Sequence, residues 1–183
     1  MGRSATSTMF SLLLASVAQG ATLCVNPGGT SGCFASVQAA VDAAASDDTI
    51  TIAAGTYVEN VLIEGRRLQL LGDDPTTTVI DGGGSGRTVT VRGPGTDLTL
   101  SRLGIRNAGP GIEVAGLTVS TSKVTVTECR STGNAGPGVS DDEGSFGGIK
   151  RARLTVVDTT VDGILERAFC CPHSPGRRSC AAR

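Results

Sequence analysis

The densest group of residues that could do chemistry is an acidic run, Asp141-Asp142-Glu143, followed by a glycine-containing loop at 144–148. Carboxylate oxygens are preferred ligands of Ca²⁺, which takes six to eight oxygens at about 2.4 Å. If carboxylates on a neighbouring segment faced this run, the two together would be a candidate site for calcium or another ligand. A solvated turn is the interpretation that we favour, so the sequence predicts no cofactor and leaves calcium as an alternative.

A second candidate is Asp81 with Gly82-Gly83-Gly84, which is rich in glycine like a phosphate-binding loop. Phosphate loops lead into a helix whose N-terminus supplies amide donors and a favourable dipole. No helical pattern follows residue 84, so we expect a wide turn.

The first twenty residues have the features of an export signal. Arg3 is their only charge, residues 9–18 (MFSLLLASVA) form an apolar stretch, and Ala18 and Gly20 place small residues before a cleavage point at Ala21. An apolar stretch of ten residues is too short to cross a bilayer, which needs about 20. We therefore expect residues 1–20 to be removed and the mature protein to be extracellular or periplasmic, without a membrane span.

Export makes disulfides possible. Cys24 and Cys33 bracket a turn at 26–29 (NPGG), which brings them together, and we expect a disulfide between them. A zinc site lacks partners, because the only histidine is the distant His173. Cys129 falls in a strand pattern and is predicted to be a buried free thiol. The pairing of three further cysteines stays open: Cys170, Cys171 and Cys180.

Charge and composition narrow the classes of partner. The chain has 16 basic and 17 acidic residues, and three of the basic ones lie in 168–183, so residues 21–167 are mildly acidic. Such a surface is a poor match for nucleic acid. Only four Phe, one Tyr and no Trp accompany 26 Gly, which is typical of short strands joined by tight turns around an aliphatic core.

The pattern of apolar residues predicts one helix followed by many strands. Val37, Ala40, Val41 and Ala44 recur at helical spacing behind Ser36, a plausible N-cap, and we expect the helix to end at 46–48. The period then changes to two. Strands are predicted at 49–52, 57–63, 68–71, 78–80, 88–91, 98–100, 111–114, 117–119, 124–126 and 154–157.

An internal repeat distinguishes a solenoid from a sandwich or barrel. Residues 107–112 (NAGPGI) recur as 134–139 (NAGPGV), an offset of 27, and strand positions recur in steps of 26 to 30, such as Leu98 to Val124 and Val124 to Leu154. A step of this length, with about three short strands, is one coil of a β-solenoid. Asn107 and Asn134 should then occupy equivalent turns and bond turn backbone.

The stretch from Ser36 to Gly82, with SVQAAVDAA, DTITI, GTYVENV, LQLLG and TVIDG, resembles the N-terminal cap and first coils of the pectin-lyase-like superfamily. It is similar to pectinesterases and to bacterial secreted right-handed β-helix repeat proteins. The resemblance implies a right-handed parallel β-helix of about four coils with a capping helix. For Tyr57, Glu59 and Asn60 it implies packing rather than catalysis.

The resemblance does not extend to a complete catalytic site. Polygalacturonase-like relatives carry an Asp-Asp pair, a Gly-His-Gly and an Arg-Ile-Lys, which Asp141-Asp142 and residues 148–150 (GIK) echo only in part. Glycoside cleavage also needs an opposed carboxylate. Pectinesterases need glutamines near the oxyanion, and none follows Gln69. Arg102 and Arg106 are the candidate bases of a lyase, although exposed arginines between strands are ordinarily solvated.

We therefore predict three segments: a signal peptide at 1–20, a β-helix at 21–167, and a Cys/Arg/Pro-rich tail at 168–183. The tail is either a disulfide-held cap or sequence of different origin, such as a frameshifted end. The function favoured is that of a secreted, non-catalytic solenoid that contacts carbohydrate. The alternatives are part of a carbohydrate-active enzyme or of a passenger-type adhesin. A weakly capped C-terminal end predicts self-association.

Overall fold

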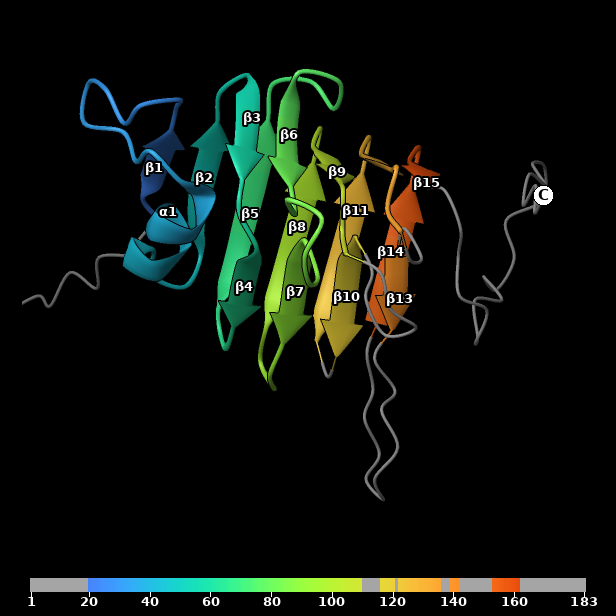
Figure 1. Ribbon diagram of the computed structural model, residues 1–183. Coiled ribbons are helices and arrows are strands. Elements are labelled where there is room, and N and C mark those ends of the chain that lie inside the picture. Colours follow the sequence, from blue (N-terminus) through green and yellow to red (C-terminus); the bar gives the residue numbers. More distant parts are fainter. Residues whose placement is uncertain (1–19, 110–115, 121, 136–138, 142–152, 162–183) are drawn as a thin grey trace, which may run out of the picture.

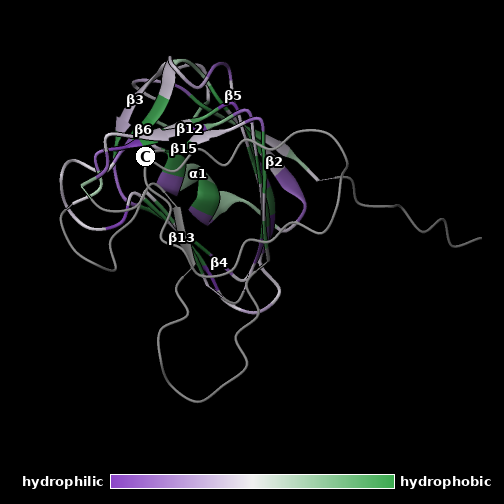
Figure 2. Ribbon diagram, turned by 90° about the vertical axis from the view of Figure 1, so that its right-hand side faces the viewer, coloured by the Kyte–Doolittle hydropathy of each residue, from purple (hydrophilic) through white to green (hydrophobic). Residues whose placement is uncertain are grey.

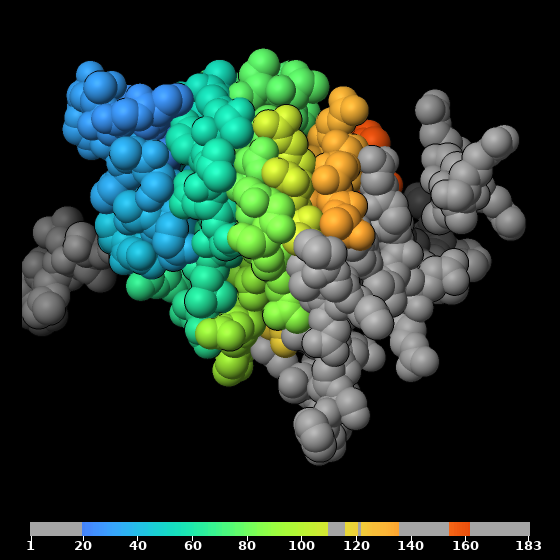
Figure 3. All heavy atoms as spheres, viewed as in Figure 1, coloured from blue at the N-terminus to red at the C-terminus, as the bar shows by residue number. Residues whose placement is uncertain are grey.

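The computed structural model describes residues 20–109, 116–120, 122–135, 139–141 and 153–161. These residues form a right-handed parallel β-solenoid of about four turns with one short helix. Successive coils follow one another in sequence order from the N-terminal to the C-terminal end (Figures 1 and 3). The predicted fold class is confirmed.

Three parallel sheets run along the solenoid, and each takes one strand from a coil. The six-stranded sheet contains β1 (Thr22–Val25), β2 (Asp48–Ile52), β5 (Arg67–Gly72), β8 (Asp97–Ser101), β11 (Lys123–Thr127) and β14 (Arg153–Val157). The four-stranded sheet contains β4 (Val61–Glu64), β7 (Val89–Arg92), β10 (Leu117–Ser120) and β13 (Val139–Asp141). The five-stranded sheet contains β3 (Gly55–Val58), β6 (Thr78–Asp81), β9 (Gly104–Arg106), β12 (Arg130–Thr132) and β15 (Thr160–Val161).

The register between coils follows the sequence repeat residue by residue. Leu68 pairs with Leu98, Leu98 with Val124, and Val124 with Leu154, so the offsets of 30, 26 and 30 are confirmed. The side chains of this row point inward and are buried. Similar rows of buried Ile, Leu and Val line the interior, and Figure 2 shows apolar residues along the strands and the helix. The core therefore consists of aliphatic side chains stacked between coils, with Tyr57 the single buried aromatic among the described residues.

Helix α1 (Val37–Ala43) covers the N-terminal end of this core. Ser36 is its N-cap, as predicted, and accepts a hydrogen bond from the Ala39 amide at 3.1 Å. Val37, Ala40 and Val41 are buried, and Figure 2 shows the helix lying across the cross-section of the solenoid. A helix of seven residues is too short to be stable alone, so its stability must come from what it contacts.

Two charged side chains from the turns that flank β4 hold α1 at both termini. Both carboxylate oxygens of Glu59 accept hydrogen bonds of 2.8 Å, one from the Val37 amide and one from the Gln38 amide. At the other end, the Arg66 guanidinium donates to the carbonyls of Val41, Asp42 and Ala44. Each charge has the sign that the helix dipole favours. Two terminal amides and three carbonyls at the C-terminal end of the helix are thereby satisfied.

Gln38 on α1 also protects the edge of the four-stranded sheet. Its side-chain oxygen accepts from the Leu62 amide at 2.7 Å, and its side-chain nitrogen donates to the Leu62 carbonyl at 3.3 Å. The amide group therefore occupies the place of a neighbouring peptide on β4, the last strand of that sheet. Unpaired strand edges invite association with other chains, which this contact prevents.

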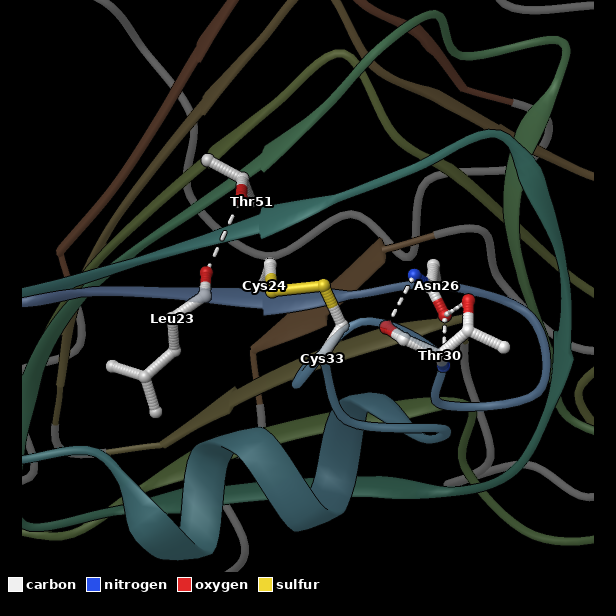
Figure 4. The surroundings of a disulfide bond; sticks show 6 residues. All are labelled: Leu23, Cys24, Asn26, Thr30, Cys33 and Thr51. Atoms are coloured by element: carbon white, nitrogen blue, oxygen red, sulfur yellow. Dashed lines mark hydrogen bonds between the residues drawn. A yellow bond between two sulfur atoms is a disulfide. The ribbon is translucent and has the colours of Figure 1, made fainter.

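The predicted disulfide is confirmed. Cys24 on β1 is bonded to Cys33, with a distance of 4.7 Å between the Cα atoms (Figure 4). The Asn26 side chain closes the intervening turn, accepting from the Thr30 amide at 2.9 Å and donating to the Thr30 carbonyl at 3.1 Å. The loop therefore stays close to β1.

Several boundaries differ from the sequence predictions. The predicted strand at 57–63 is two strands, β3 and β4, because the chain turns at Glu59 and Asn60, whose side chains bond the helix and the next coil. The helix ends at Ala43, ahead of the predicted 46–48. The remaining strands that the prediction omitted are short pieces near corners or ends: β1, β9, β12, β13 and β15. The predicted signal peptide (except Gly20), the strand at 111–114 and the tail at 168–183 lie outside the described residues.

We predict that Glu59→Gln lowers the free energy of unfolding by about 1–2 kcal/mol, because it removes the charge from two charge-assisted hydrogen bonds and places an NH₂ group against an amide donor. Urea unfolding followed by circular dichroism measures this. Glu64→Gln is the matched control, since Glu64 pairs with Arg92 on the surface and both side chains are about half exposed; its effect should stay below about 1 kcal/mol. Equal losses in the two variants would contradict the role given to Glu59.

Candidate functional site

The acidic run proposed from the sequence lies mostly outside the described residues. Asp141 is the last residue of β13, and its backbone pairs with Val119 of β10. Asp142 and Glu143 are not described. Among the described residues, no group of three or more His, Cys, Asp or Glu side chains could hold a metal ion. The solvated turn expected at Asp141, Asp142 and Glu143, and the alternative of calcium binding there, therefore both stay as the sequence leaves them.

Asp81 is a structural anchor for the glycine-rich turn. One carboxylate oxygen accepts from the Gly83 amide and from the Asn107 side chain, both at 2.9 Å, and the other pairs with Arg106 at 2.8 Å. Gly83, Gly84 and Gly86 have φ between 61° and 73°, a region that side chains rarely adopt. The turn leads into β7 and not into a helix, as expected for a wide turn.

The charge on Asp81 is favoured by its partners. Burial acts to raise its pKa, but the Gly83 amide, Asn107 and Arg106 together outweigh burial, and the pKa lies below the ordinary value of 3.8. A carboxylate committed in this way to three donors is unavailable as a general acid at neutral pH. Because Arg106 is its ion-pair partner, this arginine is also a poor candidate for the base of a lyase.

The two repeated asparagines occupy equivalent turns, as predicted. The Asn107 amide bonds the carbonyl of Gly133, the residue before Asn134. Asn134 bonds turn backbone, accepting from the Ala108 amide at 3.0 Å. The Asn107 side chain differs from the expectation, because it donates to the Asp81 carboxylate rather than to turn backbone. Asp81, Asn107 and Asn134 therefore link three successive coils.

The residues that the resemblance assigned to packing do pack. Tyr57 is buried and donates its hydroxyl to the Ala53 carbonyl at 2.8 Å. Asn60 donates to the carbonyls of Ser85 and Arg87 in the next coil. Together with Glu59 at the helix N-terminus, these contacts are structural.

The surroundings of Cys129 and Arg102 do not favour a catalytic role for either residue. Cys129 is a buried free thiol, as predicted, although it lies at the corner between β11 and β12 rather than within a strand. Burial raises the pKa of its thiol, which disfavours the reactive thiolate. Arg102 is an exposed corner residue with φ of 55°, between β8 and β9.

The outer face of the six-stranded sheet carries a row of polar side chains that sequence reasoning missed. We call it the hydroxyl row, and its members pair in register along the sheet: Thr22, Thr49, Gln69, Thr99, Thr125 and Thr155. All six are partly or fully exposed. None of their side chains forms a hydrogen bond with the part of the chain that the structure describes. Their donors and acceptors are therefore available to a ligand.

A row of charges runs beside the hydroxyl row. Arg67 pairs with Asp47 at 2.5 Å, and Lys123 pairs with Asp97 at 2.8 Å. The Arg67 hydrogen bond to Asp47 lowers the pKa of that carboxyl. We call these four residues the ion row. Each of its two cations has its own carboxylate, so these four residues are together neutral; in register, the row continues to Arg153, whose backbone pairs with Lys123.

On the other side of the hydroxyl row lies a mixed row, again in register: Thr51, Leu71, Ser101, Thr127 and Val157. Thr51 donates its hydroxyl to the Leu23 carbonyl (Figure 4). Leu71 and Val157 give this row apolar surface among hydroxyl groups. A sequence signal for all three rows existed. The period-two alternation marks the outward positions of each strand, and the 26- and 30-residue steps place these positions beside one another.

We predict that Asp81→Asn lowers the free energy of unfolding at pH 7 by about 1–3 kcal/mol, because three donors lose a charged acceptor. A carboxyl whose pKa is lowered by folding stabilises the protein fully above its ordinary pKa of 3.8. That contribution is lost as pH falls through the lowered value. Chemical unfolding at several pH values should therefore show the two proteins converging at the acidic end. A difference that stayed constant down to pH 2 would contradict this assignment.

Comparison with known proteins supports the fold and leaves the activity open. No protein-family model matches the sequence, and no curated protein matches it. A solved structure of a pectin methylesterase mutant in complex with a hexasaccharide is similar, with a TM-score of 0.53, 16% identity, and coverage of 78% of this chain and 49% of that one. Pectin methylesterase from carrot has a TM-score of 0.50 and 18% identity, with coverage of 80% and 53%. The chain thus spans about half the length of these enzymes.

At these identities the likeness shows the fold alone. No helix among the described residues is long and apolar enough to cross a membrane. The in-register sheets, the helical cap and these structural neighbours agree: the protein has a right-handed parallel β-helix fold, similar to that of the pectin methylesterases.

Proposed function

We propose that this protein is exported and acts without catalysis, binding polysaccharide on the outer face of the six-stranded sheet. The observation that carries the proposal is the hydroxyl row, six partly or fully exposed residues in register whose side chains make no hydrogen bonds within the described structure. A polysaccharide presents hydroxyl groups at a regular repeat, so it can exchange hydrogen bonds with several members of the row at once.

Two observations support the carbohydrate class and the export. A protein of the same fold has been solved with a hexasaccharide bound. The Cys24–Cys33 disulfide fits an oxidising compartment, as does the signal-like stretch at 1–20.

Most of the described carboxylates have structural partners, the exposed corner residues Glu128 and Asp158 excepted, which supports a non-catalytic role. Asp81, Asp97 and Glu64 are in ion pairs. Asp48 accepts from the Ala21 and Ala45 amides, and Glu59 accepts from the first amides of α1. General acid–base catalysis needs a carboxyl that is free to exchange a proton with substrate, and these groups are occupied.

We predict that the protein is retained by polysaccharide and does not turn it over. Affinity electrophoresis in gels that contain a polysaccharide should show retardation, and the double variant Gln69→Ala/Thr99→Ala should lose most of it. The matched control is Thr90→Ala, a half-buried threonine on the four-stranded sheet. Neither methanol release from methylated pectin nor formation of unsaturated uronides should occur, with or without calcium. Turnover abolished by Asp141→Ala or Asp142→Ala would revive the enzyme alternative.

We also propose that copies of the chain associate through the C-terminal end of the described solenoid. Val156 belongs to an inward row, yet 43% of it is exposed, against 2% for its register partner Val126. Strands β14 and β15 are the last in their sheets among the described residues, which leaves one edge of each open. Sedimentation of residues 21–183 over a concentration series should show dimers, and Val156→Asp should shift the equilibrium toward monomer. A strictly monomeric protein at high concentration would contradict this.

A further inference from the structure

We infer that the ligand of the outer face is an uncharged linear polysaccharide that lies along the solenoid axis, across the strands. This inference rests on the proposed function and adds the direction and the charge of the ligand. It is carried by the hydroxyl row, the ion row and the mixed row, which lie side by side on the six-stranded sheet.

The direction follows from the register. Members of the hydroxyl row lie on successive strands, about 4.8 Å apart, so six of them extend over about 24 Å along the axis. Residues two apart on one strand, such as Thr99 and Ser101, are about 6.6 Å apart and belong to different rows. Only a ligand that runs along the axis meets the same kind of group at each step.

The mixed row fits the non-polar side of the same ligand. A sugar ring has hydroxyl groups at its edge and C–H groups on its faces. Gln69 and Leu71 lie two residues apart on β5, so a ring over this strand could bond the amide and cover the leucine. The described part of the face contains no aromatic side chain, so affinity must come from many weak contacts along a long chain.

The charge follows from the ion row. Arg67 and Lys123 are 59% and 55% exposed, but each already has a carboxylate within hydrogen-bond distance. A polyanion that approached either cation would also meet Asp47 or Asp97, both exposed, and would have to displace it. An uncharged chain meets no such repulsion. Between Asp47 and Lys123, paired charges of alternating sign therefore select against a polyuronate.

The other two outer faces lack this combination. On the four-stranded sheet the equivalent row contains Leu62, Thr90 and Thr118, and Thr118 is only 1% exposed. On the five-stranded sheet the row from Thr56 continues through Val79 and Gly104 before it reaches Arg130. Neither face repeats an exposed hydrogen-bonding group on every strand.

The test compares uncharged and anionic polymers on one protein. Affinity electrophoresis at low salt uses hydroxyethyl cellulose and galactomannan as uncharged probes and polygalacturonate as the polyanion. We expect binding to at least one uncharged polymer that is about ten-fold tighter than binding to polygalacturonate and that changes little with salt. Affinity for oligosaccharides of the bound polymer should rise with length until the ligand is as long as the row.

The decisive variant is Asp97→Asn, which leaves Lys123 without its carboxylate. This variant should bind polygalacturonate more tightly, so the ratio between the affinity for the uncharged polymer and the affinity for polygalacturonate should fall about three-fold or more. Glu64→Gln is the control, because it changes the net charge equally but unpairs Arg92 on the four-stranded sheet; it should leave the preference unchanged. Circular dichroism of each variant checks that the fold is retained.

The outcomes separate the two proposals. Absence of binding to every polymer would overturn the proposed function itself. Tighter binding to polygalacturonate than to the uncharged polymers would overturn this inference and leave polysaccharide binding in place. The same conclusion would follow if Asp97→Asn and Glu64→Gln changed the ratio of affinities equally. A preference for uncharged chains that only Asp97→Asn narrows would establish it.

Discussion

Each coil of this protein buries its inward side chains only against the coils before and after it. A row such as Leu68, Leu98, Val124 and Leu154 is stable because every member has a neighbour. No coil precedes the first one in the described part of the chain, and α1 takes that place. This explains why a helix of only seven residues is held by Glu59 at one end and Arg66 at the other. The stacked coils therefore depend on the helix to bury the apolar side chains of the first coil.

Stacking of the coils holds several corner residues in an unfavourable backbone conformation. Arg102, Glu128 and Asp158 occupy equivalent positions after the six-stranded sheet, and all have φ between 46° and 55°. This conformation costs a residue other than glycine roughly 1–2 kcal/mol. Burial of the adjoining aliphatic rows keeps the chain there, because a relaxed corner would move the next strand out of register. Ion pairs such as Asp81–Arg106 add a second link between coils.

The repeat in the sequence was sufficient to predict the register, because one residue of slip would move every aliphatic side chain to the solvent. It was not sufficient for β9, β12 and β15, whose two or three residues are too few for alternation to be visible. Residues 57–63 were predicted as one strand because the turn at Glu59 and Asn60 depends on contacts with α1 and Arg87. The acidic run at 141–143 attracted attention as a cluster, whereas the hydroxyl row is dispersed over 134 positions, from Thr22 to Thr155, and becomes a site only when the coils stack.

The outer face is a consequence of the same constraint that builds the core. Strand alternation fixes Thr99 outward whenever Leu98 and Leu100 are inward, so the register that aligns the leucines also aligns the threonines. The register steps between coils of this sheet vary between 20 and 30 residues, and the turns absorb the difference without shifting either row. A substitution on the outer face therefore leaves the inward rows, and with them the fold, intact. Under the proposed function, ligand selectivity and stability reside on opposite sides of the same strands.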